Sequence, residues 1–199
     1  MKAKDNPFSV QRVLQIRYRF DEGGWDDLLR RLESLRFRAA IVGQHGSGKS
    51  TLLEDLRPRL AEQGFTCKPL LLNERTPRFE RRFLNTFLAE LASRDIILFD
   101  GAERMSWLRW RRFMAASRNV AGLIITTHHP GRLRTLITCH TTANLLHEIV
   151  RELVHGESGE WEEIADQLYK KHQGNLRDAL REMYDWVATN ELPRLRPTQ

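Results

Sequence analysis

One stretch of eight residues constrains this chain more than any other part of its sequence. It fits the pattern G-x-x-x-x-G-K-S/T in full, and its members are Gly43, Gln44, His45, Gly46, Ser47, Gly48, Lys49 and Ser50. An apolar run precedes it at 39–42, and a helical pattern starts near Ser50. A buried strand, a glycine-rich loop and a helix N-terminus in this order direct backbone N–H groups toward a phosphate. The stretch therefore predicts a nucleotide site, with Lys49 at the β- and γ-phosphates, Ser50 as a Mg²⁺ ligand, and Thr51 among the phosphate-binding residues.

Strand and helix patterns alternate around this loop. Short apolar runs predict further strands over 65–72, 95–100, 122–127 and 135–139. Apolar residues at helical spacing predict helices over 25–35, 50–63, 79–91 and 105–118. This alternation predicts an α/β fold of three layers (α/β/α), in which a parallel sheet is covered by helices on both faces.

From Thr141 onward the chain shows helical patterns only. With 199 residues, of which 41% are hydrophobic, the chain is long enough for one domain with a real core and too short for two full ones. We expect an N-terminal segment at 1–24, a P-loop core over 25–140, a small C-terminal helical lid over 141–189 and a disordered tail at 190–199.

Acidic side chains follow the strand predicted at 95–100. Asp100 comes directly after an apolar run, at the carboxyl edge of the sheet, where ligands bind in open α/β folds. We expect Asp100 to hold Mg²⁺ together with Ser50. Glu103 is a candidate for polarising the attacking water, and equally a glutamate that the dipole of a helix N-terminus favours.

Polar residues also end the strand predicted at 122–127. Thr127 is a candidate contact for the γ-phosphate or the attacking water, although polar residues are common where a strand meets solvent. His128 and His129 follow it. Because no further histidine, cysteine or acidic cluster stands nearby at ligand spacing, we do not expect a metal site at these histidines.

A second informative segment lies near the C-terminus. Gly174 suits the end of one helix, Asn175 the N-cap of the next, and Asp178 its first turn. Arg177 lies in the same first turn, where the positive end of the dipole disfavours a cation. A phosphate contact would explain Arg177, and a solvated side chain is the alternative.

Together these residues resemble ATPases of the AAA+ type, or close relatives in the additional-strand class of P-loop ATPases. The matching segments are 43–50 as Walker A, 96–100 as Walker B, 126–127 near sensor 1 and 174–177 as sensor 2. Small bacterial members with an Asp-Gly-x-Glu second motif, such as transposition and helicase-loading ATPases, are nearest in character. The resemblance implies a sheet ordered 5-1-4-3-2, ATP and Mg²⁺ as ligands, a role for Arg177 at the nucleotide, and often ring or filament assembly.

Three features depart from the family pattern, and the first is the small size of the helical lid predicted over 141–189. Glu103 is not adjacent to Asp100, where many of these ATPases place their catalytic glutamate. The connection between the strands at 122–127 and 135–139 is too short for the helix that normally ends in the arginine finger, and it contains Arg132 and Arg134.

These features favour an ATPase or an ATP-driven switch that acts on a macromolecule, and they leave two alternatives open. One is a small-molecule or nucleotide kinase, whose second phosphate substrate would meet the arginines Arg75, Arg78, Arg81 and Arg82. The other is a nucleotide sensor or scaffold that does not hydrolyse ATP.

The net charge of +6 permits an acidic partner without requiring one. A protein, a second copy of the chain and DNA are the candidate partners. DNA would meet the aromatic and arginine residues at 107–114, although an amphipathic helix packed on the sheet has the same pattern.

Cys67 and Cys139 both fall in apolar stretches, and no apolar run is long enough to span a membrane. We therefore expect a reducing, cytoplasmic location and no membrane partner.

Overall fold

The computed structural model describes residues 6–155 and 159–189, so the tail predicted at 190–199 lies outside the described residues. The chain divides into two compact units. We call Tyr18–Gly43 with Gly48–Cys139 the sheet unit. The described residues of Met1–Arg17, Gln44–Ser47 and His140–Gln199 form the helical unit.

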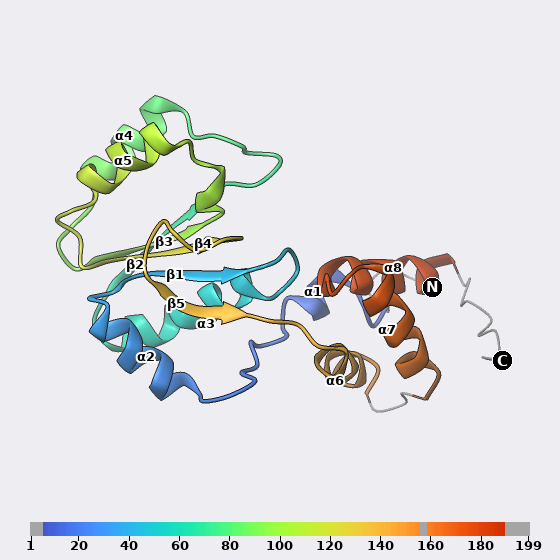
Figure 1. Ribbon diagram of the computed structural model, residues 1–199. Helices are drawn as coiled ribbons and strands as arrows, with labels where there is room; N and C mark the ends of the chain where they lie inside the picture. Colours follow the sequence, from blue (N-terminus) through green and yellow to red (C-terminus); the bar gives the residue numbers. More distant parts are fainter. Residues whose placement is uncertain (1–5, 156–158, 190–199) are drawn as a thin grey trace. The chain divides into compact units, whose positions relative to one another are not determined.

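Five parallel strands form the centre of the sheet unit (Figure 1). They are β1 (Arg38–Gly43), β2 (Thr66–Leu71), β3 (Asp95–Asp100), β4 (Gly122–Thr127) and β5 (Thr135–Cys139). Their order across the sheet is β2-β3-β4-β1-β5, which confirms the predicted parallel sheet and its order. The P-loop follows β1. Strand β4 lies between β1 and β3, and β3 ends at Asp100.

Helices cover both faces of this sheet, as predicted. Figure 1 shows α2 (Trp25–Ser34) and α3 (Lys49–Glu62) on one face, and α4 (Arg81–Ala89) and α5 (Trp107–Ala116) on the other. The β1 side chains alternate between the two layers. Ala39 and Ile41 pack with α2 and α3, whereas Ala40 and Val42 pack with α5. This alternation is the period-two geometry of a strand that is buried on both faces.

The helix predicted over 105–118 is slightly shorter in the structure, where α5 spans Trp107–Ala116, and a separate short helix precedes it. A short 3-10 helix, η2 (Ala102–Arg104), follows β3, and α5 begins only after Ser106, which has an extended backbone. Gly101 starts this turn with a φ of +80°, and a Cβ there would lie 2.1 Å from the Leu72 carbonyl oxygen. Only glycine, which has no Cβ, fits so close to another backbone. Gly101 therefore allows the chain to turn sharply directly after Asp100.

The helical unit contains α1 (Val10–Val13), α6 (Ala143–Leu153), α7 (Gly159–Lys171) and α8 (Leu176–Thr189). Thr142 caps α6, since its hydroxyl accepts a hydrogen bond from the Leu145 N–H at 3.1 Å. The core of the unit consists mainly of aliphatic side chains from α6, α7 and α8. The sequence pattern did not predict α1, whose four residues are too few to show helical periodicity.

Residues from the start of the chain belong to this helical core. Phe8 is buried and its ring lies 4.9 Å from that of Trp161 in an edge-to-face contact. The Asn6 amide donates to the Tyr184 carbonyl at 2.9 Å. Among the described residues, no helix is long and apolar enough to cross a membrane.

Candidate functional site

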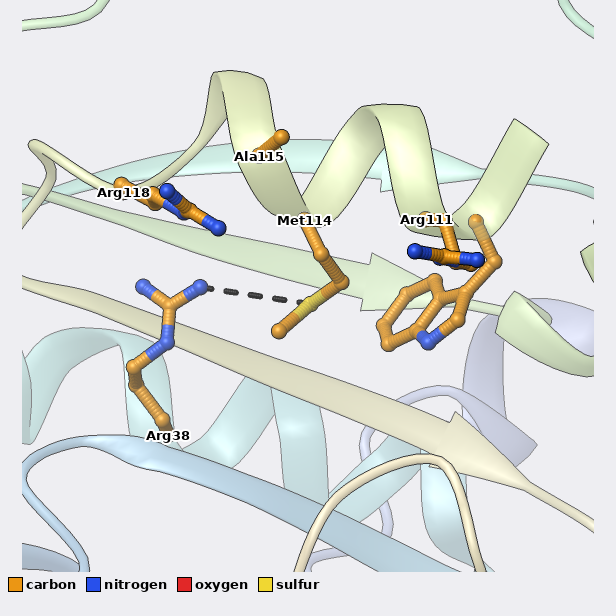
Figure 2. Close-up of a pocket in the computed structure, with 6 residues that line it drawn as sticks. Arg38, Arg111, Met114, Ala115 and Arg118 are labelled. Carbon is orange, nitrogen blue, oxygen red and sulfur yellow. Dashed lines mark hydrogen bonds between the residues drawn. The ribbon is translucent and has the colours of Figure 1, made fainter. Parts of the chain in front are cut away.

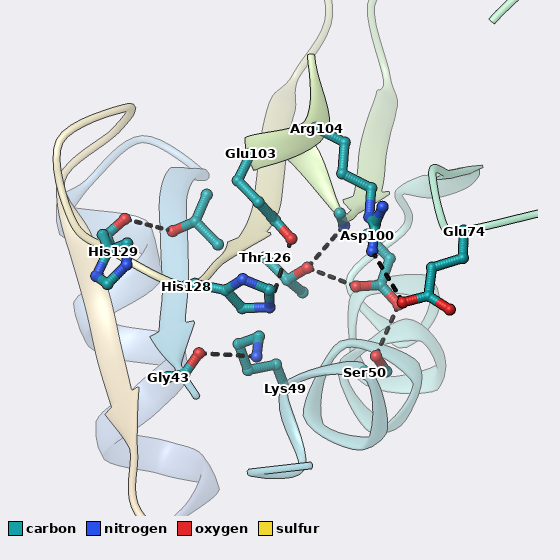
Figure 3. Close-up of polar contacts among 12 residues, drawn as sticks. Gly43, Lys49, Ser50, Glu74, Asp100, Glu103, Arg104, Thr126, His128 and His129 are labelled. Atoms are coloured by element: carbon teal, nitrogen blue, oxygen red, sulfur yellow. Dashed lines mark hydrogen bonds and ion pairs between the residues drawn. The ribbon is translucent and has the colours of Figure 1, made fainter. Parts of the chain in front are cut away.

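The glycine-rich loop joins β1 to α3. Gly43 ends the strand, Gly48 stands before the first helical residue with a φ of +83°, and Gly46 has a φ of +71°. Lys49 is the first residue of α3 and is 8% exposed. Its ammonium group donates to the Gly43 carbonyl at 2.8 Å, so the side chain folds back along the loop (Figure 3). The two glycines adopt the left-handed backbone that this curled loop requires.

A buried hydroxyl lies within the same loop. Ser47 is 5% exposed, and its Oγ has no hydrogen-bond partner among the described residues. Leaving a buried hydroxyl unpaired costs about 1–3 kcal/mol, so such a group in a binding loop fits a ligand that would satisfy it.

Asp100 lies beside the start of α3, although it comes from a different strand. The Ser50 hydroxyl donates to Asp100 Oδ2 at 2.7 Å. The Thr126 hydroxyl donates to the other oxygen, Oδ1, and itself accepts from the Gly101 N–H at 2.9 Å. Both carboxylate oxygens of Asp100 are therefore oriented by hydroxyl groups (Figure 3).

Thr126 is the strand-end residue that the structure places at this acid. In the register of the sheet Phe99 pairs with Ile125, so the residues that follow them, Asp100 and Thr126, are neighbours. The hydroxyl of Thr127 instead donates to the His129 carbonyl at 2.9 Å, and its side chain is buried. Strand register is the signal that distinguishes the two threonines, and it follows only from the pairing of β3 with β4.

Glu103 faces His128 from η2. Their closest atoms, Glu103 Oε1 and His128 Nε2, are 3.5 Å apart, and Glu103 Oε2 is buried with no hydrogen-bond partner among the described residues. Figure 3 shows both side chains in the same cluster as Asp100 and Lys49. A carboxylate oxygen left unpaired in this way is available to accept a proton or a hydrogen bond.

Arg132 fixes the turn that carries Glu103. Its guanidinium donates to the Met105 carbonyl and, at 3.3 Å, to the Glu103 carbonyl. It also lies 5.1 Å from the ring centroid of Trp110, and burial lowers its pKa. Arg132 thus has a structural role within the sheet unit.

An aromatic side chain borders the loop on the sheet unit. Two ring carbons of Tyr18 lie 3.4 and 3.5 Å from the point that a Cβ on Gly48 would occupy. The Tyr18 N–H donates to Asp55 Oδ2 at 2.7 Å, and the hydroxyl contacts the Cys139 sulfur at 3.4 Å. Burial raises the pKa of Tyr18, so the hydroxyl stays protonated. No local sequence pattern singled out Tyr18, because the segment before α2 lacks periodicity.

The segment predicted around Arg177 forms a capped helix start in the helical unit. The Asp178 N–H donates to Asn175 Oδ1 at 3.3 Å, and the Asn175 amide donates to Asp178 Oδ2 at 2.6 Å. The tip of the glycine-rich loop belongs to the same unit, and a Cβ on Gly46 would lie 1.9 Å from Asn175 Oδ1. The side chain of Arg177 is exposed in the first turn of α8.

The residues at the site fit a magnesium ion. Mg²⁺ prefers oxygen ligands and usually keeps several waters, so one hydroxyl and one carboxylate are a suitable protein contribution. Ser50 and Asp100 supply this pair. Among residues 6–155 and 159–189, no group of three or more histidine, cysteine or acidic side chains is arranged to hold a metal by itself.

Comparison with known proteins identifies the fold. No protein-family model matches the chain, and no curated protein sequence does. Among solved structures, a mutant of RuvB from Thermotoga maritima matches with a TM-score of 0.54 at 16% sequence identity. The match covers 86% of this chain and 66% of that one, so this chain spans less than two thirds of the RuvB chain. This likeness and the five-stranded parallel sheet show a three-layer α/β fold of the P-loop NTPase type.

Proposed function

We propose that this chain binds ATP with Mg²⁺ and acts as an ATPase or an ATP-driven switch of the AAA+ type on a macromolecular partner. One observation carries the proposal: the Ser50 hydroxyl and the Asp100 carboxylate meet at 2.7 Å beside the loop that carries Lys49. This is the pair of oxygen ligands that P-loop NTPases use for Mg²⁺. The RuvB-like fold supports the proposal, because a glycine-rich loop between β1 and α3 is the phosphate site of P-loop proteins.

Five polar side chains of the site have roles in this proposal, together with the backbone of the P-loop. The backbone N–H groups of the P-loop bind the phosphates, and Lys49 contributes its charge at the β- and γ-phosphates. Ser50 and Asp100 would hold Mg²⁺, which when bound would neutralise charge on the phosphate oxygens. Thr126 orients Asp100, and Glu103 orients or deprotonates the attacking water through its unpaired Oε2.

The helical unit contributes Arg177 to the proposed mechanism. Its exposed guanidinium is available for a phosphate, and the adjacent Asn175 contacts the loop tip at Gly46. We propose that Arg177 reads the γ-phosphate, so that the helical unit responds to ATP and not to ADP.

Nucleotide binding is tested by thermal unfolding with and without MgATP. At a ligand concentration of one hundred times Kd the stabilisation is about 2.7 kcal/mol, because only the folded chain binds. Lys49→Ala is expected to lose most of this stabilisation. Lys170→Ala, at an exposed lysine in the last turn of α7, is the matched control and is expected to keep it. Equal stabilisation of Lys49→Ala and wild type would overturn the proposal.

A phosphate-release assay separates the possible reactions. An ATPase releases phosphate from ATP without an added acceptor, and a switch does so faster with its partner. A kinase needs an acceptor, and a sensor binds ATP with negligible turnover. These cases are distinguished by measuring the ATP turnover of the protein by itself, with DNA added, and at several protein concentrations.

A further inference from the structure

A second concave site lies at the opposite edge of the sheet from the glycine-rich loop. Arg38 is the first residue of β1, whose last residue, Gly43, leads into that loop. The pocket at this amino edge has a volume of about 430 Å³. Its lining, part of which Figure 2 labels, consists of Arg38, Trp110, Arg111, Met114, Ala115 and Arg118. We call it the α5 pocket, because most of its lining comes from that helix.

The α5 pocket is positively charged and contains no compensating acid. Three of its lining residues are arginines and none is acidic. Figure 2 shows the guanidinium groups of Arg38 and Arg118 directed toward one another across the pocket. Burial lowers the pKa of Arg38, which reflects the loss of water around its charge. A bound carboxylate would restore a favourable partner to these groups.

Helix capping explains only part of this arrangement. Arg38 Nη1 donates to the Ser117 carbonyl at 3.1 Å, directly after the last turn of α5, where a cation is favourable. Arg38 Nη2 reaches only the Met114 sulfur at 4.0 Å (Figure 2), which is a weak contact. Arg111 lies within α5 and does not cap the helix end.

The uncharged lining of the α5 pocket is apolar, and two exposed residues of α5 add further apolar surface. Trp110, Met114 and Ala115 are its uncharged lining residues. On the same helix, Trp107 is 63% exposed and Leu108 is 66% exposed, and the Arg111 guanidinium lies 4.8 Å from the ring centroid of Trp107. Tryptophan and arginine are enriched among the hot-spot residues that contribute most of the binding energy in protein–protein interfaces.

We propose that the α5 pocket, with Trp107 and Leu108, binds an acidic segment of a protein partner in which a large apolar side chain stands between carboxylates. The apolar side chain would pack against the uncharged lining residues, and the carboxylates would pair with Arg38, Arg111 and Arg118. A single-stranded nucleic acid fits less well, because its bases stack on successive exposed aromatic rings, and Trp110 and Phe113 of α5 are buried. This site is separate from the nucleotide site and goes beyond the function proposed above.

Binding is tested with the whole chain and a labelled peptide in which aspartate and glutamate alternate with leucine and phenylalanine. The control peptide carries asparagine and glutamine in place of the acids. Fluorescence anisotropy without nucleotide is expected to show binding of the acidic peptide only. Arg111→Gln and Arg118→Gln are each expected to weaken it about tenfold or more, the scale of one hydrogen bond between charged groups.

Arg109→Gln is the matched control, because Arg109 is an exposed arginine of the same helix that does not line the pocket. It is expected to change the affinity for the acidic peptide less than threefold. The proposal is overturned if the acidic peptide does not bind, or if Arg109→Gln weakens peptide binding as much as Arg118→Gln does. It is also overturned if a single-stranded oligonucleotide binds more tightly than the peptide and its binding depends on Arg111 and Arg118. Unchanged melting temperatures of the three variants show that the fold is intact.

Discussion

The Ser50 hydroxyl donates to the Asp100 carboxylate at 2.7 Å, although fifty positions separate the two residues in the chain. Ser50 lies in the first turn of α3, and Asp100 is the last residue of β3. Parallel strands bring their carboxyl ends to one edge, so a loop after one strand and an acid after another meet there. The contact assembles the proposed magnesium site from two elements that local sequence patterns can each identify.

Asp100→Asn is expected to weaken the magnesium dependence of ATP binding. The amide keeps the size of the side chain and loses the charge that attracts a divalent cation. Thermal unfolding with ATP, in Mg²⁺ and in EDTA, measures this effect. The wild type is expected to lose most of its stabilisation in EDTA, whereas Asp100→Asn is expected to differ little between the two conditions. Asp185→Asn, at an exposed site on α8, is the control and should behave as wild type.

Glu103→Gln is expected to separate binding from hydrolysis. If Glu103 orients or deprotonates the attacking water, turnover should fall about a hundredfold or more, the usual scale for the loss of a general base. The ATP affinity should change little, because the amide keeps the size of the side chain and the charged group nearest to Glu103 is His128, which lies outside the glycine-rich loop. Glu74→Gln provides the comparison, since Glu74 is an exposed acid whose carboxylate lies 3.8 Å from Arg104. Turnover that is the same in Glu103→Gln and wild type would remove Glu103 from the mechanism.

Gly101→Ala is expected to destabilise the sheet unit. The backbone there has a φ of +80°, and the new Cβ would lie 2.1 Å from the Leu72 carbonyl oxygen. Strain of this kind costs about 1–3 kcal/mol before any clash is counted. Gly24→Ala is the matched control, because nothing lies within 4 Å of its Cβ position and its backbone is extended. Urea unfolding of both variants compares the two losses.

The features that the sequence predicted well are those that local physics determines. Buried strands with apolar runs, the glycine pattern at 43–50 and the asparagine cap of α8 each depend on a few adjacent residues. Thr126 could not be distinguished from Thr127 in this way, because its contact with Asp100 depends on the register between two strands. The packing of Phe8 against Trp161 joins residues far apart in the chain, and no periodicity before Trp25 indicated it.

Glu182 gives the helical unit a pH-dependent contribution to stability. Burial raises the pKa of its carboxyl, but hydrogen bonds from Lys171 and His172 outweigh this effect and leave the pKa below its usual value of 4.5. A carboxylate with a lowered folded-state pKa stabilises the fold above its unfolded pKa, and this stability is lost as the pH falls through the folded pKa. Glu182→Gln should therefore cost up to about 1 kcal/mol at pH 7, the scale of a surface ion pair. In urea unfolding the difference from wild type should shrink below about pH 4.5, and a difference independent of pH would contradict this interpretation.

Arg177→Ala is expected to distinguish ATP from ADP. If Arg177 reads the γ-phosphate, its charge-assisted hydrogen bonds exist only in the ATP state. The variant should then lose about 1.5–3 kcal/mol of ATP affinity, the range for hydrogen bonds to charged groups, and much less ADP affinity. The stability of α8 should not fall, because removing a cation from its first turn is neutral or mildly favourable for the helix dipole. Calorimetric titration of both nucleotides measures the two affinities, and Arg181→Ala, at an exposed arginine of the same helix, is the control.

A purely structural role for Arg177 predicts the reverse, with lower stability in the absence of nucleotide and equal losses of affinity for ATP and ADP. Equal losses would mean that the helical unit does not sense the nucleotide through this residue.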